Sequence, residues 1–169
     1  IILALGCKLG IFFPSFNETN NAISYQAPSG AHWFGTDFMG RDVMARAAHG
    51  TVTSLTVGLW GTGLAVIIGT LLGSLAGYFG KLVDEGIVWL YTTIDTIPYI
   101  LLVSAFSLVL GPSLYTLCIA IGLTTWVGLC RVVRAEFIKH REKEYVQAAS
   151  SIGASHARRI FTHILPNVF

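Results

Sequence analysis

Among the residues that could do chemistry, Asp95 is the most isolated, because it is the only Asp, Glu, Lys or Arg in residues 86–130. A carboxylate within a membrane span is by default a candidate for an ion or substrate pathway. It can instead bond backbone groups at a helix break, which Pro98 predicts nearby. If one span ends near Gly111, Asp95 lies about 6 Å from its inner end. That depth favours the structural role, and the pathway role stays open.

Patterns that indicate an enzyme or a metal site are missing from the sequence. There is no G-x-x-x-x-G-K-[ST] phosphate loop, no H-E-x-x-H and no G-x-S-x-G. The five histidines lack the close spacing of a metal site. We therefore predict no catalytic residue, no metal site and no cofactor within this chain.

The elements that position these residues are long apolar stretches. The chain is 53% hydrophobic and 12% charged, against about 25% charged residues in ordinary soluble domains. Residues 47–80 carry no Asp, Glu, Lys or Arg, and a membrane-spanning helix needs roughly 20 apolar residues. We predict spans at 52–78, 87–110 and 113–130, with a turn at Gly111, Pro112 and Ser113.

These spans divide the chain into segments. Residues 1–13 are too short to cross a membrane and do not resemble a signal peptide, so we predict that they end a first span whose start is missing. Residues 14–50 form an extracytoplasmic loop, 51–135 hold the three spans, 136–167 form a cytoplasmic segment, and 168–169 start a truncated next span. The expected fold is an all-α, polytopic membrane helical bundle, present here as a fragment.

The distribution of Lys and Arg predicts the orientation. Residues 131–169 carry seven basic and three acidic side chains, a net charge of +4, whereas residues 14–54 carry two basic and three acidic, a net charge of −1. Because Lys and Arg concentrate in cytoplasmic loops, the tail is placed inside and the early loop outside. Beside three spans this basic tail indicates contact with anionic membrane lipid rather than with nucleic acid.

Three glycines recur every four residues in the first full span, Gly69, Gly73 and Gly77. They share one helix face, where small residues let another helix approach closely. We interpret the stripe as a helix-packing seam, with sliding or hinging during transport as the alternative.

The end of the chain predicts two short amphipathic helices. Tyr145, Ala148, Ala149 and Ile152 share one face. Gly153 is a helix-ending residue and Ser155 a plausible cap for a second helix. The apolar stripe of that helix is Ile160, Phe161, Ile164 and Leu165, and Pro166 is expected to end it. The pair either lies on the membrane surface or fits a cleft in a cytoplasmic partner.

This tail resembles the cytoplasmic loop of permease subunits of binding-protein-dependent ATP-binding-cassette (ABC) importers, in the dipeptide, oligopeptide and nickel branch. That loop reads E-A-A, three residues, Gly, nine residues, I-x-L-P. Here Gln147 stands for the Glu and His163 for the Ile. The branch form Y-V-x-A-A…G-A…R-I…H-I-L-P-N is matched. The resemblance implies that these residues couple to an ATPase: Glu144, Tyr145, Gln147, Ala148, Ala149, Gly153, Ala154, Arg159, Leu165 and Pro166.

A second stretch resembles the same family's G-T-D-x-x-G-R-D-V-x-x-R motif after the first span. The matching residues are Gly35, Thr36, Asp37, Gly40, Arg41, Asp42, Val43 and Arg46. The glycines permit tight turns, and Asp42 with Arg46 is expected to form an i, i+4 pair. A structural lead into the next span is favoured over contact with substrate.

The resemblance implies a type I importer permease with six spans, multi-pass in a bacterial or archaeal cytoplasmic membrane. It would pair with a homologous permease, two cytoplasmic ABC ATPases that hold ATP and Mg, and an extracytoplasmic solute-binding protein. The expected function is peptide import by alternating access, with no chemistry in this chain. The alternatives are an ATP-independent secondary transporter or channel, a permease for nickel or another small solute, and a membrane scaffold or receptor.

Overall fold

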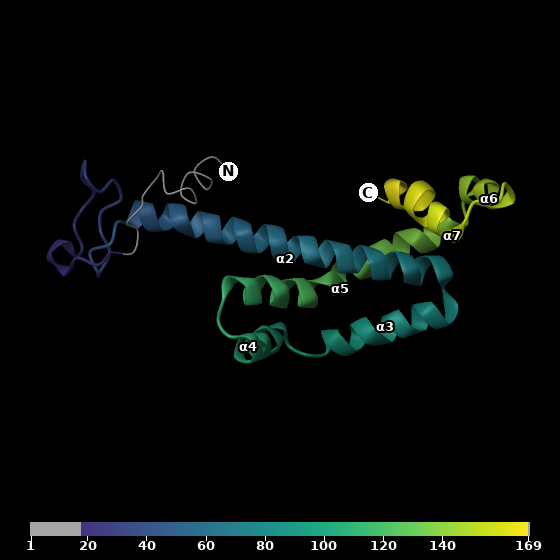
Figure 1. Cartoon of the computed structure of the whole chain (residues 1–169), viewed down its shortest axis with the longest axis horizontal. Coiled ribbons are helices and arrows are strands. Elements are labelled where there is room, and N and C mark those ends of the chain that lie inside the picture. Colours follow the sequence, from purple (N-terminus) through teal and green to yellow (C-terminus); the bar gives the residue numbers. More distant parts are fainter. Residues whose placement is uncertain (1–17, 169) are drawn as a thin grey trace. The chain divides into compact units, whose positions relative to one another are not determined.

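A computed structural model describes residues 18–168. Its elements are η1 (Asn21–Ile23), α2 (Val43–Phe79), α3 (Lys81–Asp95), α4 (Tyr99–Leu110), α5 (Leu114–Arg141), α6 (Glu144–Ser151), α7 (His156–Arg158), η2 (Arg159–Ile164) and η3 (Leu165–Asn167) (Figure 1). Residues 18–168 contain no β-strand, only an isolated bridge between Thr36 and Asp42. The predicted all-α fold is confirmed. The span end predicted at 1–13 lies outside the described residues, as does Phe169.

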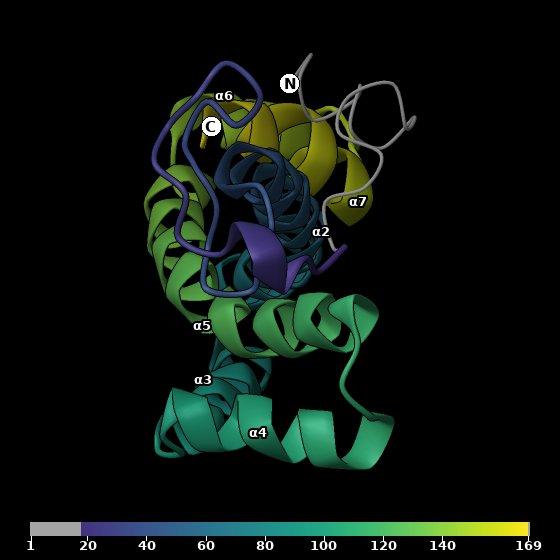
Figure 2. The same ribbon diagram turned by 90° about the vertical axis from the view of Figure 1, so that its left-hand side faces the viewer.

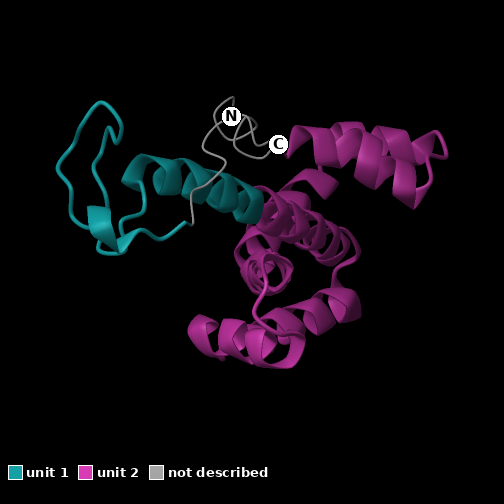
Figure 3. Ribbon diagram, turned by 60° about the vertical axis from the view of Figure 1, so that its left-hand side comes forward, with its two compact units in different colours: residues 1–58 teal, residues 59–169 magenta. Residues whose placement is uncertain are grey.

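The chain divides into two compact units (Figure 3). Residues 1–58 contain the loop before α2 and the first turns of that helix. Residues 59–169 contain the rest of α2 and all later elements. The loop motif and the basic tail therefore belong to different units.

Two helices, α2 and α5, are long and apolar enough to cross a membrane, with 37 and 28 residues. The first turn of α5 is capped by Ser113, whose side chain accepts a hydrogen bond from the Thr116 N–H. The shorter α3 and α4 pass the same test only as a pair. Residues 18–168 thus hold two candidate spans, or three if that pair crosses once.

The predicted span at 87–110 is not one straight helix. It is divided between α3 and α4, which are bent by 85° at their break. Pro98 has no N–H to continue the α3 ladder, and its ring disfavours helical backbone at Ile97. The depth predicted for Asp95 was counted along one unbroken helix, which the break at Pro98 interrupts. Asp95 instead ends α3, 14 residues after Lys81 and so about 21 Å along the helix.

Helix bounds also differ from the predicted span limits. α2 begins at Val43, inside the loop expected to reach residue 50. α5 continues to Arg141, so the boundary expected at 135 falls within a helix. Both differences have one cause. Hydrophobicity predicts where a helix meets lipid, whereas backbone hydrogen bonds continue into water.

The glycine seam of α2 faces α5 of the same chain. A Cβ on Gly69, Gly73 or Gly77 would lie 2.9, 2.7 or 2.6 Å from a backbone carbonyl oxygen of α5. Such distances are shorter than carbon–oxygen contacts in close-packed helices. The two backbones therefore touch along these three turns, with no room for a side chain between them.

Two apolar clusters lie along α5. One contains Ala65, Tyr91, Trp126, Val127 and Cys130. The other contains Val133, Phe137, Val146, Ile160 and Ile164. The first joins α2 and α3 to α5, and the second holds the tail of the chain against the C-terminal half of α5. α4 packs beside the first turns of α5 (Figure 2), and its Leu108 and Val109 are 86% and 82% exposed.

Candidate functional site

Residues 144–167, the coupling segment, form the strongest candidate site, and their first half ends at Gly153. α6 closes with a Schellman motif. The Gly153 N–H donates to Ser150 O and the Ala154 N–H to Ala149 O, both at 3.0 Å. Gly153 has φ +82°, and a Cβ there would meet nothing within 4 Å. The backbone conformation, rather than lack of space, therefore favours glycine here.

The second half of the segment starts at Ser155, whose side chain accepts a hydrogen bond from the Arg158 N–H. A short α-helical turn is followed by the π-helix η2 and then by η3. Pro166 was expected to end this helix, but a 3₁₀ turn carries it to Asn167. Because Pro166 has no N–H, the π-helical ladder of η2 cannot continue through it, and a 3₁₀ turn follows.

The buried face of α6 differs from the predicted one. Val146 and Ala149 are 3% and 6% exposed, whereas Tyr145 is 37% and Ile152 86% exposed. In the second half, Ile160 and Ile164 are buried as predicted, but Phe161 is 53% exposed. The segment buries the face that packs against Val133 and Phe137 of α5. Periodicity within the segment cannot predict which face meets another helix.

Polar contacts tie the coupling segment to its surroundings. Arg159 donates from Nη1 to Ser150 Oγ at 3.0 Å, which links the two halves, and its guanidinium lies 5.7 Å from the ring centre of Tyr78 on α2. The Tyr78 hydroxyl is 2.9 Å from His156 Nδ1. At the start of α6, the Tyr145 hydroxyl is 2.7 Å from Nδ1 of buried His140, and burial raises the pKa of Tyr145.

Several other residues that match the family's loop pattern are exposed at the surface of the segment. Glu144 is exposed in the first turn of α6, where an acidic side chain favours the helix dipole. Gln147 is exposed and donates to Glu142 O at 3.0 Å. Ala148 and Pro166 are exposed, and Leu165 is partly buried. The segment is thus packed on one face and open on the other.

Arginines of α5 hold α3 at both ends, a feature that sequence reasoning missed. Arg134 donates from Nε and Nη2 to the two carboxylate oxygens of Asp84. One turn earlier, Arg131 Nη2 lies 2.7 Å from Asp95 Oδ2. Opposite charges within apolar helices are the signal that could have found these pairs.

The G-T-D-x-x-G-R-D motif at residues 35–42 is organised around Asp37. Its carboxylate accepts from the N–H groups of Met39 and Arg41, and it pairs with the guanidinium groups of Arg41 and Arg46. Partial burial raises the pKa of Asp37, but these bonds outweigh it and lower the pKa to about 2. Gly35 and Gly40 have φ +70° and +67°, the left-handed backbone that favours glycine.

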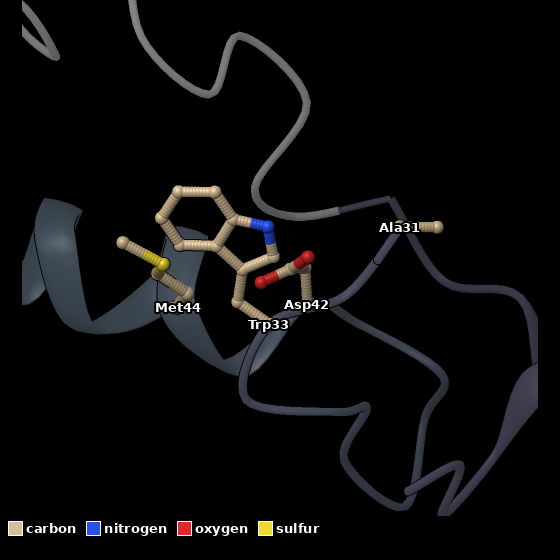
Figure 4. Close-up of a pocket in the computed structure, with 4 residues that line it drawn as sticks. All are labelled: Ala31, Trp33, Asp42 and Met44. Atoms are coloured by element: carbon tan, nitrogen blue, oxygen red, sulfur yellow. The ribbon is translucent and has the colours of Figure 1, made fainter. Parts of the chain in front are cut away.

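The predicted pair between Asp42 and Arg46 is wrong. Asp42 caps α2 by accepting from the Ala45 N–H at 3.0 Å, and its other oxygen lies 2.8 Å from His32 Nδ1. Burial raises the pKa of Asp42, but the hydrogen bonds from His32, Ala45 and Met44 lower it by more, so the net shift is downward. Thr36 is buried and donates to Ile23 O. A small pocket beside Asp42 is lined by Ala31, Trp33 and Met44 (Figure 4).

No group of three His, Cys, Asp or Glu side chains that could hold a metal ion occurs within residues 18–168. The profile of the family described as "Binding-protein-dependent transport system inner membrane component" matches residues 69–169, which include the glycine seam, the arginine pairs and the coupling segment. This chain belongs to that family.

Curated relatives align over nearly the whole chain. The dipeptide transport system permease protein DppC of Alkalihalophilus pseudofirmus is 41% identical over 99% of this chain and 57% of its own length. The oligopeptide transport system permease protein OppC of Bacillus subtilis is 34% identical over 99% of this chain and 56% of its length. The DppC protein of Bacillus subtilis is 38% identical over 99% and 53%. The chain thus spans about half the length of the curated relatives that it matches.

Proposed function

We propose that this chain is part of the permease subunit of an ABC importer for peptides. The observation that carries the proposal is the coupling segment, which packs on the end of α5 with one face and leaves the other open. The relatives are named as dipeptide and oligopeptide transport permeases, which supports peptides as the substrate class. The permease would work in the cytoplasmic membrane with a homologous permease, two ATPases that hold ATP and Mg, and an extracytoplasmic solute-binding protein.

The contacts of the segment suggest how motion would pass from an ATPase to the spans. The apolar cluster at Phe137 and Ile164 holds the segment on α5, and Arg159 and His156 reach Tyr78 on α2. The pair of Arg134 with Asp84 extends the connection to α3. A push on the segment would therefore move three helices together, as in coupled rigid-body transitions.

The open face of α6 is the surface proposed to contact the ATPase. Ile152 is 86% exposed and Tyr145 is 37% exposed. An exposed apolar side chain at the corner of two helices suits insertion into a cleft of a partner. Because nothing in the described residues covers Ile152, its substitution leaves the packing of this chain unchanged.

The test uses the full-length subunit expressed with its partners. Ile152→Asp should reduce ATPase retention on purification and peptide uptake about tenfold or more, because a buried unpaired charge is costly at an interface. Ser151→Asp is the matched control: it adds the same charge at the neighbouring exposed residue. Peptide uptake that continues without ATP, or full ATPase retention by Ile152→Asp, would refute the proposal.

A further inference from the structure

The ion pair of Asp95 with Arg131 is exposed on the surface of this chain. The two side chains are 51% and 46% exposed, and their closest atoms are 2.7 Å apart. The Arg131 guanidinium also lies 4.9 Å from the ring centre of Tyr91, so one side of it is covered by α3.

The position of the pair argues against contact with lipid. Both side chains belong to candidate spans, Asp95 to the bent pair of α3 and α4 and Arg131 to α5. It also ends the helix, where the macrodipole disfavours a negative charge. Arg131 is the only cation paired with it in the described residues. Charged side chains within membrane spans face protein or water.

Exposed hydroxyl groups occur near the pair along the chain, together with exposed apolar side chains such as Ile97 and Val132. The hydroxyl groups belong to Thr92, Thr93, Thr96 and Tyr99 around the break and to Thr125 on α5. The break itself leaves backbone outside a regular helix between α3 and α4 (Figure 1). Within a membrane, irregular backbone is tolerated where it lines a cavity or is buried in protein.

We propose that Asp95 and Arg131 bind the charged termini of a peptide during its passage, which rests on the proposed function. Asp95 accepts hydrogen bonds from the peptide's α-ammonium group, and Arg131 donates to its α-carboxylate, a geometry that guanidinium groups favour. Without cargo the two side chains neutralise each other. A zwitterionic peptide gives each a new partner, so the net charge of the site stays zero throughout the exchange.

The experiment measures ATP-driven uptake by the complete transporter in proteoliposomes with three probes: alanyl-alanine, its N-acetyl form and its C-terminal amide. Asp95→Asn should reduce the preference for alanyl-alanine over the N-acetyl form about tenfold, and Arg131→Gln should do the same for the amide. One binding protein serves every variant, so a changed ratio belongs to the permease. Asp84→Asn, at the other end of α3, should lower uptake of all probes without changing either ratio.

A second measurement covers variants that do not assemble. In a transporter whose other cysteines are replaced, Thr92→Cys should react with a maleimide reagent, and alanyl-alanine should slow that reaction while the doubly blocked peptide does not. The assignment would be overturned if the uptake ratios did not change, or if alanyl-alanine did not slow the maleimide reaction. It would also be overturned if the sole effect of Asp95→Asn were release of the homologous permease. Absence of ATP-driven uptake by the unmodified transporter would refute the proposed function itself.

Discussion

Replacing Gly73 by alanine tests whether the close contact of α2 with α5 stabilises the fold. The new Cβ would lie 2.7 Å from Cys130 O and 2.9 Å from Val133 Cβ, and carbon–carbon contacts are favourable near 3.5–4.0 Å. The helices must separate by a few tenths of an ångström or more, and overpacking of this kind costs about 1–3 kcal/mol. Alanine recovers about 0.5–1 kcal/mol as the better helix former. We expect a net destabilisation of up to about 2.5 kcal/mol.

The assay is unfolding of the full-length subunit in mixed micelles by titration with SDS, followed by circular dichroism. Gly63→Ala is the matched control, because Gly63 lies on the same helix and a Cβ there meets nothing within 4 Å. That variant should be neutral or stabilised by up to about 1 kcal/mol. Equal behaviour of the two variants would refute the reasoning. It would show that α2 and α5 are not in backbone contact at Gly73.

Three further predictions concern the backbone at Gly153, the ion pairs of Asp37 and the orientation of the chain in the membrane. Gly153→Val should keep membrane abundance but lose substrate-stimulated ATP hydrolysis, because a β-branched residue at φ +82° costs at least about 1 kcal/mol. Gly153→Asn should keep substrate-stimulated ATP hydrolysis, because asparagine tolerates this backbone. Normal ATP hydrolysis by the valine variant would contradict the role assigned to the backbone of Gly153. The depressed pKa of Asp37, about 2 against 3.8, means that its stabilisation is present above about pH 4 and is lost as the pH falls toward 2. Fluorescence of Trp33 as the sole tryptophan should follow that loss, and Asp37→Asn should abolish the pH dependence; an unchanged acid transition in that variant would assign it elsewhere. A cysteine at Ser29 should react with an impermeant thiol reagent added outside intact cells and one at Ser151 should not, and reversed labelling would overturn the orientation.

The sequence by itself determined the class of the fold and the positions of its corners. The long uncharged stretches predict membrane helices, because a helix that crosses the hydrocarbon core needs about 20 consecutive apolar residues. Gly153 and Ser155 were predicted as a helix end and a helix cap. The structure places a Schellman motif at the first and an N-cap at the second, because both are local properties of a few residues of backbone.

Only the tertiary structure decided which side chains meet. Asp42 pairs with His32 and Arg46 with Asp37, although sequence spacing favours a pair of Asp42 with Arg46. The buried face of α6 is set by Val133 and Phe137, and the partner of Asp95 is an arginine 36 residues away. Periodicity describes one element at a time, whereas these contacts depend on how α5 packs against its neighbours. The physical reason is that hydrogen bonds and charges act over a few ångströms in space, whatever the separation along the chain.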